Sequence, residues 1–167
     1  MKYFSTNTEQ QEVKRPERKR KYHQGRFVPT HPEKYKGDPT NIVYRSSWEL
    51  KLMRFLDDNT NVLEWSSEEF FIPYVNPFDK KAHRYFPDFF VRVKEKDGKI
   101  KTMILEVKPS AQTKEPTKKR ISRKYVTEVV TWGVNESKWK ACHKYCEERD
   151  WEFRIVTEQD LFGSNGP

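Results

Sequence analysis

The segment at residues 89–108 constrains the fold more than any other part of the chain, because it alternates between apolar and polar side chains on both sides of a turn signal. Apolar residues recur at every second position in residues 89–93 and again in residues 103–107, and the turn-favouring pair Asp97-Gly98 separates the two runs. Alternation with a period of two predicts a β-hairpin with one face in a hydrophobic core. The fold is therefore expected to be organised around a β-sheet.

The length of the hairpin loop decides which residues face each other. A two-residue turn would place Phe89 opposite Glu106 and so mix apolar and acidic side chains on one face. A three-residue loop with Gly98 in the left-handed conformation shifts the pairing by one residue. Phe89 then faces Leu105, and Asp88 lies directly opposite Glu106, where cross-strand Cβ atoms are about 4.5–5.5 Å apart. The register that builds the better core therefore also brings two carboxylates together.

Two carboxylates at that distance repel each other unless a cation lies between them. Lys108 follows Glu106 by two residues, so both side chains share one face of the strand. A Pro-Asp pair followed by Glu-x-Lys on the next strand is typical of metal-dependent nucleases. In this hypothesis Asp88 and Glu106 hold the metal with help from the Val107 carbonyl, and Lys108 positions or activates the attacking water. Because the ligands are hard oxygens, the expected ion is Mg²⁺ or Mn²⁺.

Each of these residues also has an ordinary structural explanation. Asp88 could be a turn carboxylate that follows Pro87, and Glu106 with Lys108 could be an exposed ion pair. The Glu-x-Lys pattern occurs five times in this lysine-rich chain, so the pattern alone is weak. The three residues together point to a nuclease more strongly than any one of them does.

Glu49 has two competing explanations. Apolar residues at helical spacing predict a helix at residues 46–58. From its first turn Glu49 could bind a second metal or the water shell of the first. However, Ser46 and Glu49 also fit a capping box, in which Glu49 reaches back to the Ser46 N–H. The residues alone favour capping over catalysis.

Shorter patterns predict the remaining elements and the domain organisation. We expect a basic, largely irregular arm at residues 1–34, where charged residues and prolines are frequent, and a single domain at residues 35–167. The order of elements describes an α/β fold with a mixed central sheet flanked by helices. Within the domain we expect strands at residues 61–65, 70–74 and 151–156, a helix that ends at Gly133, and another helix from Asn135 to about residue 149.

Basic residues cluster in two segments on either side of a nearly neutral body. Residues 1–36 carry ten basic and four acidic side chains, and residues 108–124 carry seven basic and one acidic. Such clusters gain affinity for a polyanion by releasing its counterions, so we expect DNA or RNA as the partner. No stretch reaches the roughly 18 consecutive apolar residues of a membrane span, and we expect no membrane partner. The candidate contacts to the nucleic-acid backbone are Arg84, Gln112, Lys118, Lys119, Arg120, Arg123 and Lys124.

Five short motifs stand out along the chain: YKGDP at residues 35–39, IVYRSSWE at 42–49, YFPDF at 85–89, ILEVKP at 104–109 and WGVN at 132–135. Together they resemble the head-completion nucleases of tailed bacteriophages, which are similar to the endonuclease subunit of heteromeric transposases in the PD-(D/E)XK superfamily. The resemblance covers about residues 26–161. It implies a restriction-endonuclease-like fold, with the active site at one edge of a mixed central sheet.

The resemblance also implies roles for the site residues and a biological setting. Glu49 corresponds to the helical acidic residue of the family, Asp88 to the metal ligand of its Pro-Asp motif, and Glu106 with Lys108 to its Glu-x-Lys pair. The implied setting is phage assembly on DNA, in the host cytoplasm or in the virion, with head, portal or neck proteins as partners. The competing hypothesis is a non-catalytic DNA-binding structural protein of the virion, at the portal or the packaged DNA end.

Overall fold

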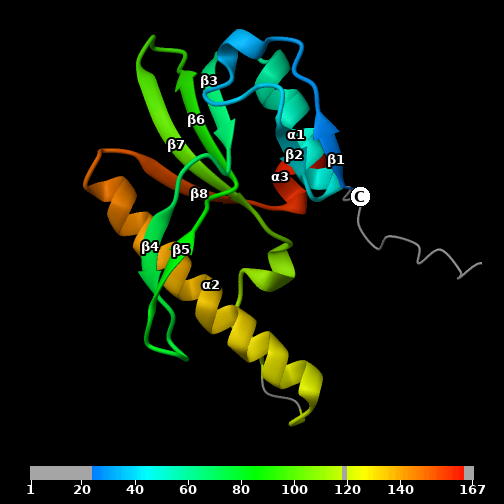
Figure 1. Ribbon diagram of the computed structural model, residues 1–167, viewed down its shortest axis with the longest axis vertical. Coiled ribbons are helices and arrows are strands. Elements are labelled where there is room, and N and C mark those ends of the chain that lie inside the picture. Colours follow the sequence, from blue (N-terminus) through cyan, green and yellow to red (C-terminus); the bar gives the residue numbers. More distant parts are fainter. Residues whose placement is uncertain (1–23, 118–119, 164–167) are drawn as a thin grey trace, which may run out of the picture.

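The computed structural model describes residues 24–117 and 120–163. Its centre is a four-stranded sheet with the strand order β3-β6-β7-β8 (Figure 1). β6 is antiparallel to both β3 and β7, whereas β8 is parallel to β7, so the sheet is mixed as expected. These strands are β3 (Val62–Ser67), β6 (Phe89–Lys94), β7 (Ile100–Val107) and β8 (Glu152–Val156).

The predicted register of the β6–β7 hairpin is confirmed. Phe89 pairs with Leu105, as the three-residue loop requires. The loop closes with a hydrogen bond of 2.9 Å from the Gly98 N–H to the Glu95 carbonyl, and Gly98 has a φ of 85°. A residue with a side chain would be strained at this φ, which explains why glycine ends the loop.

One face of the sheet carries the larger hydrophobic core, beneath α1 and the β1–β2 ribbon. Because strand side chains alternate, Phe89, Val91 and Leu105 all point to this face, where Leu52 and Met53 of α1 meet them. The core explains why residues near 46–58 form an amphipathic helix, as predicted. The elements on this face are β1 (Gly25–Phe27), β2 (Ile42–Tyr44) and α1 (Ser47–Asp58).

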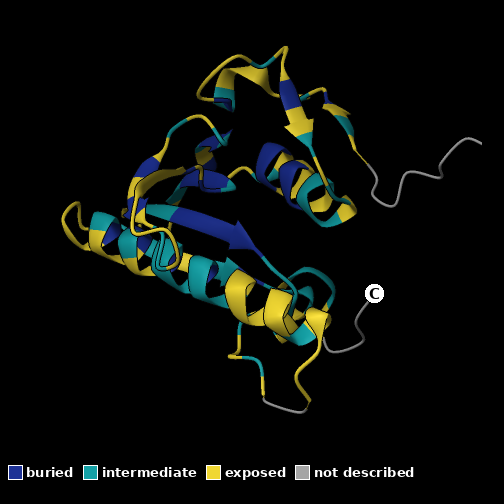
Figure 2. Cartoon of the chain, turned by 60° about the horizontal axis from the view of Figure 1, so that its bottom comes forward, coloured by how far each residue is buried: buried dark blue, intermediate teal, exposed yellow. Residues whose placement is uncertain are grey.

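The opposite face is covered by α2 and the β4–β5 ribbon (Figure 1). Ile104 of β7 packs there with Cys142 and Cys146 of α2, and all three side chains are buried. The first turns of α2 are exposed, whereas its later turns are packed against the sheet (Figure 2). The elements are β4 (Ile72–Val75), β5 (Ala82–Tyr85) and α2 (Arg123–Glu147), and a short helix, α3 (Glu158–Phe162), follows β8.

The prediction that one helix ends at Gly133 and another begins at Asn135 is wrong. α2 runs without interruption from Arg123 to Glu147. A Cβ atom at position 133 would lie 3.0 Å from the Phe78 ring, so glycine is explained by the close approach of the β4–β5 turn. Glycine inside a helix costs about 1 kcal/mol relative to alanine, and a local contact of this kind is a sufficient reason for it.

Within the expected irregular arm, residues 25–27 and 32–34 form short regular elements, and this part of the chain packs on the domain. Phe27 in β1 joins the main core, and a 3₁₀ helix follows at Pro32–Lys34. The Lys34 ammonium donates hydrogen bonds of 2.9 and 2.8 Å to the carbonyls of Leu56 and Asn59 at the end of α1. The prolines do not prevent this, because proline is tolerated at helix starts and outside paired strands. The remainder of the predicted arm, residues 1–23, lies outside the described residues.

No helix within residues 24–117 and 120–163 has the length and apolarity needed to cross a bilayer. β5, at Ala82–Tyr85, is an additional strand in a segment that the sequence pattern did not identify as regular structure.

Candidate active site

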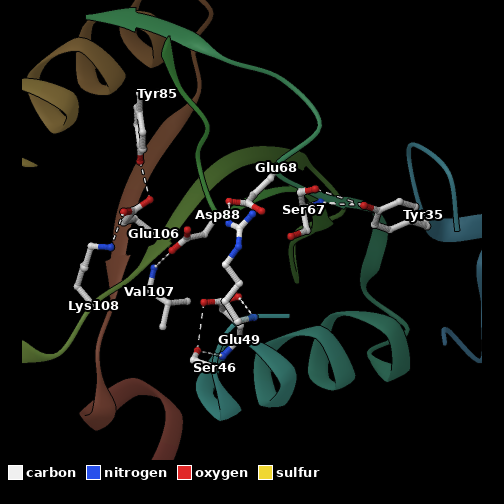
Figure 3. A network of polar contacts seen from close by, with 11 residues as sticks. Tyr35, Ser46, Glu49, Ser67, Glu68, Tyr85, Asp88, Glu106, Val107 and Lys108 are labelled. Atoms are coloured by element: carbon white, nitrogen blue, oxygen red, sulfur yellow. Dashed lines mark hydrogen bonds and ion pairs between the residues drawn. The ribbon is translucent and has the colours of Figure 1, made fainter. Parts of the chain in front are cut away.

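Asp88 and Glu106 meet where the β6–β7 hairpin ends, as the register predicts. Phe89 pairs with Leu105, so the preceding residue, Asp88, comes opposite Glu106. The Asp88 Oδ2 atom accepts a hydrogen bond of 2.7 Å from the Val107 N–H (Figure 3). This bond fixes the Asp88 side chain across the end of β7.

The Glu106 carboxylate is buried and is held from two sides (Figure 3). The Tyr85 hydroxyl donates a hydrogen bond of 2.6 Å to Oε2, and the Lys108 ammonium lies 3.1 Å from Oε1. The Glu106 side chain is 5% exposed and that of Lys108 is 25% exposed, so the alternative of an exposed surface ion pair does not apply. Charged groups are costly to bury unless they are compensated, and here an ammonium and a phenol provide part of that compensation.

Asp88 lies in an environment that favours its protonated form. Burial raises the pKa of Asp88 most, and the negative charges of Glu106 and Glu49 raise it further. The Lys108 ammonium and the Val107 N–H act in the opposite direction, and the net result is a pKa raised to about 8. A divalent cation between the two carboxylates would offset this repulsion and favour the charged form of Asp88.

Lys108 remains charged in this environment. Burial lowers the pKa of its ammonium group, but the charges of Glu106 and Asp88 outweigh burial and raise the pKa above its ordinary value. A charged donor is therefore present beside the two acids throughout the physiological pH range. Such a group can stabilise negative charge that develops on a phosphate.

Tyr85 is a site residue that the sequence analysis missed. Its side chain is buried, and burial followed by the nearby charge of Glu106 raises the pKa of its hydroxyl, which therefore stays a hydrogen-bond donor. The only signal in the sequence was its position at the start of the YFPDF motif. Its contact with Glu106 depends on how β5 packs across β7, which the local pattern does not contain.

Glu49 makes contacts in the first turn of α1, close to those that the capping explanation predicts. The Ser46 Oγ atom accepts a hydrogen bond of 3.1 Å from the Glu49 N–H, so Ser46 is the N-cap of α1. The Glu49 carboxylate reaches back to the Arg45 N–H at 2.8 Å, one residue before the expected Ser46 N–H. The negative charge of Glu49 also raises the pKa of Asp88 slightly, and Glu49 lies on the helix next to the site (Figure 3).

Asp88 and Glu106 provide oxygen ligands for a hard divalent cation, but no third acidic ligand lies beside them in the part of the chain that the structure describes. Within the described ranges, no group of three or more His, Cys, Asp or Glu side chains is close enough to hold a metal together. Asp88 and Glu106 therefore form a pair, and Glu49 is held at a distance by its contacts in the first turn of α1. Two carboxylates without Cys or His suit Mg²⁺ or Mn²⁺ better than zinc.

The predicted DNA-contacting residues fall into two groups. Arg84 on β5 and Gln112, at the end of the 3₁₀ helix Ser110–Gln112, lie close in sequence to site residues, and both are exposed. The other group is basic and lies at, and just before, the exposed beginning of α2, which extends away from the sheet (Figure 1). It consists of Arg120, Arg123 and Lys124, whereas Lys118 and Lys119 lie outside the described residues.

The amino-acid sequence is similar to those of known proteins. The family model for the N-terminal region of TnsA-like endonucleases matches residues 59–158, which contain Asp88, Glu106 and Lys108. The head completion nuclease of Enterobacteria phage T4 is 37% identical over 142 residues, which cover 82% of this chain and 92% of that protein. The small ribosomal subunit protein mS75 of Arabidopsis thaliana is 34% identical over 121 residues, which cover 71% of this chain but only 27% of that protein.

The fold and the comparisons agree. A mixed central sheet between helices, with acidic residues at the end of a β-hairpin, is the restriction-endonuclease-like architecture that the motifs implied. On these grounds the chain belongs to the family of TnsA-like endonucleases and shares it with the phage T4 head completion nuclease.

Proposed function

We propose that this protein is a DNA endonuclease that uses Mg²⁺ or Mn²⁺ to hydrolyse phosphodiester bonds during completion of a phage head. The observation that carries the proposal is the convergence of Asp88, Glu106 and Lys108 at one end of the β6–β7 hairpin, with Glu106 buried and Asp88 partly buried. The setting is supported by the name of the phage T4 relative, which aligns with most of this chain. The protein would act in the host cytoplasm during assembly, with head, portal or neck proteins as its partners.

Asp88 and Glu106 would hold the metal, with the Val107 carbonyl as a further ligand. When bound, the metal would polarise the scissile phosphate and lower the pKa of a water molecule. Asp88 must give up any proton it carries to become a ligand, and its raised pKa makes metal binding stronger as the pH rises. The hydrogen bond from the Val107 N–H keeps the Asp88 carboxylate facing the site meanwhile.

Lys108 would act on the phosphate and on the attacking water. Its ammonium lies 3.1 Å from Glu106 and can donate hydrogen bonds in other directions as well. In the proposed reaction these bonds orient the water and stabilise the charge that builds on the phosphate oxygens. Glu49, fixed by the Arg45 N–H, would accept a hydrogen bond from the water shell of the metal or bind a second ion.

The exposed basic residues would hold the DNA backbone without reading its sequence. Arg84 and Gln112, which are exposed and close in sequence to the site residues, would contact phosphates next to the scissile bond, and the beginning of α2 would reach a more distant part of the DNA. Contacts of this kind make binding strongly dependent on salt. The full proposed set is Arg84, Gln112, Lys118, Lys119, Arg120, Arg123 and Lys124.

The proposal is tested by incubating supercoiled plasmid with the purified protein. Nicked or linear product should form with Mg²⁺ or Mn²⁺ and should be absent in EDTA. Cleavage that continues unchanged in EDTA would contradict metal dependence. A gel shift without any cleavage under all metal conditions would instead support the structural DNA-binding hypothesis.

Tyr85→Phe is expected to weaken metal binding without unfolding the protein. The change removes the hydroxyl that holds Glu106 Oε2, and loss of a partner that orients a ligand typically costs about 10- to 100-fold in metal affinity. Mn²⁺ affinity would be measured by isothermal titration calorimetry, and cleavage should recover at high Mn²⁺. Tyr74→Phe, a buried tyrosine on the neighbouring strand, is the matched control and should bind Mn²⁺ normally. Equal affinity in the two variants would show that Tyr85 does not position Glu106.

A further inference from the structure

The β4–β5 ribbon carries two exposed phenylalanine rings next to the proposed active site. Ile72 pairs with Tyr85, so the next position along the ribbon brings Phe71 opposite Phe86. The two ring centroids are 5.9 Å apart with an interplanar angle of 54°, and the residues are 46% and 43% exposed. The rings touch each other and still present much of their surface to solvent.

The hydrophobic core does not explain this pair. Ile72, Tyr74 and Tyr85 point inward and are buried in the core beneath α2. Phe71 and Phe86 alternate with these inward residues and therefore lie on the outer face of the ribbon. The two adjacent rings form a small exposed aromatic surface that a flat ligand could contact.

The Arg84 side chain lies beside the Phe71 ring on the outer face of the ribbon. The Arg84 guanidinium carbon lies 4.9 Å from the centroid of the Phe71 ring, and Arg84 itself is exposed. Within the described ranges, Arg84 has no acidic side chain within ion-pair distance, so its charge is available to a ligand. An exposed ring beside an unneutralised guanidinium matches the two parts of a nucleotide, a flat base and a charged phosphate.

The exposed rings are close along the chain to the proposed active-site residues. Phe86 is two residues before Asp88, a distance of at most about 7 Å along the backbone. Pro87, between them, is fully buried, and its ring restricts the backbone that joins Phe86 to Asp88. Tyr85, on the other side of Phe86, holds Glu106. The backbone of Phe86 therefore lies close to that of Asp88, on the segment that also carries the Glu106 partner Tyr85.

We propose that Phe71, Phe86 and Arg84 bind an unpaired stretch of DNA beside the scissile phosphate, so that the preferred substrates are single-stranded or frayed. The face of a base is hidden inside a duplex and becomes available for stacking only when the base is unpaired. The rings stack on bases, and Arg84 pairs with the adjoining phosphate. The inference rests on the proposed endonuclease function and adds a substrate class to it.

The test measures binding in EDTA, so that it does not depend on cleavage. Fluorescence anisotropy would compare a labelled oligothymidine with a labelled duplex hairpin, using the wild type and the double variant Phe71→Ala/Phe86→Ala. We expect the double variant to bind the single strand about tenfold more weakly or worse, because base stacking on aromatic side chains is lost. Binding of the duplex should change by less than about twofold. Phe55→Ala, which removes an exposed phenylalanine from α1, is the matched control and should bind as the wild type does.

A second variant separates stacking from apolar contact. Phe71→Leu/Phe86→Leu keeps apolar side chains but removes the aromatic faces, and it should lose single-strand binding as the alanine variant does. Leucine variants that bind like the wild type, or equal losses for both DNA forms, would overturn the proposal. Unchanged DNA binding combined with failure of head completion in infected cells would also overturn it and would assign the surface to a protein partner. Loss of single-strand binding in a protein that cuts no DNA would refute the endonuclease function alone.

Discussion

Lys108→Met is expected to reduce DNA cleavage by about 10²- to 10⁴-fold while DNA binding remains nearly unchanged. Methionine fills a similar volume but provides no charge and no hydrogen-bond donor. The phosphate oxygens then lose a donor that is fixed 3.1 Å from Glu106, and the attacking water loses a group that orients it. Initial rates on a labelled DNA substrate, measured with Mg²⁺ in excess, would give the size of the loss.

The control for this variant lies on the same hairpin. Lys96→Met changes an exposed lysine in the loop at the opposite end of β6 and β7, and it should cleave as the wild type does. Lys108→Arg restores charge but not size, and partial activity there would identify charge as the important property. A Lys108→Met protein that binds and cuts DNA at the wild-type rate would exclude Lys108 from the reaction.

Asp88→Asn is expected to abolish metal-dependent cleavage and, in EDTA, to remove a pH dependence of stability. The pKa of Asp88 is raised from 3.8 to about 8, chiefly by burial and then by Glu106. The folded protein therefore holds a proton that the unfolded chain releases above about pH 4. The resulting stabilisation is fully present below that pH and is lost as the pH rises to about 8.

Asparagine carries no charge and keeps an oxygen that can accept the Val107 N–H bond. Relative to the wild type, the Asp88→Asn protein should therefore gain stability between about pH 5 and pH 9, by an amount of a few kcal/mol since one pKa unit corresponds to about 1.4 kcal/mol. Urea unfolding in EDTA at several pH values measures this difference. Mg²⁺ should stabilise the wild type at pH 9 but have little effect on the variant.

The matched control is Asp97→Asn in the hairpin loop, where the side-chain oxygen accepts the Lys99 N–H bond at 3.0 Å and asparagine can do the same. Its difference from the wild type should not change with pH. A stability difference for Asp88→Asn that is equally independent of pH would contradict the buried, charge-repelled environment assigned to Asp88.

The parts of the site that follow from local rules could be predicted from the sequence. Strict alternation fixed the faces of β6 and β7, and Gly98 identified the loop type, so the position of Asp88 opposite Glu106 followed directly. Ser46 likewise marked the start of α1. In each case the physical cause lies within a few residues of its effect.

The parts that depend on tertiary packing could not be predicted in this way. The Tyr85–Glu106 bond depends on how the β4–β5 ribbon packs against the sheet, and Gly133 lies within α2, where the Phe78 ring leaves no room for a side chain. Residues 25–27 pair with β2, although the proline-rich segment between them suggested an irregular chain. None of these contacts leaves a periodic signal in the sequence, because the partners are distant along the chain or come from different elements.

Anomalous diffraction from crystals soaked in Mn²⁺ tests the central claim most directly. We expect an anomalous peak for a Mn²⁺ ion that lies about 2.0–2.3 Å from carboxylate oxygens of both Asp88 and Glu106. Glu49 should either bind a second ion or accept a hydrogen bond from a water molecule on the first. Soaked crystals that show no peak between Asp88 and Glu106, or show the ion on unrelated acidic residues, would contradict the account.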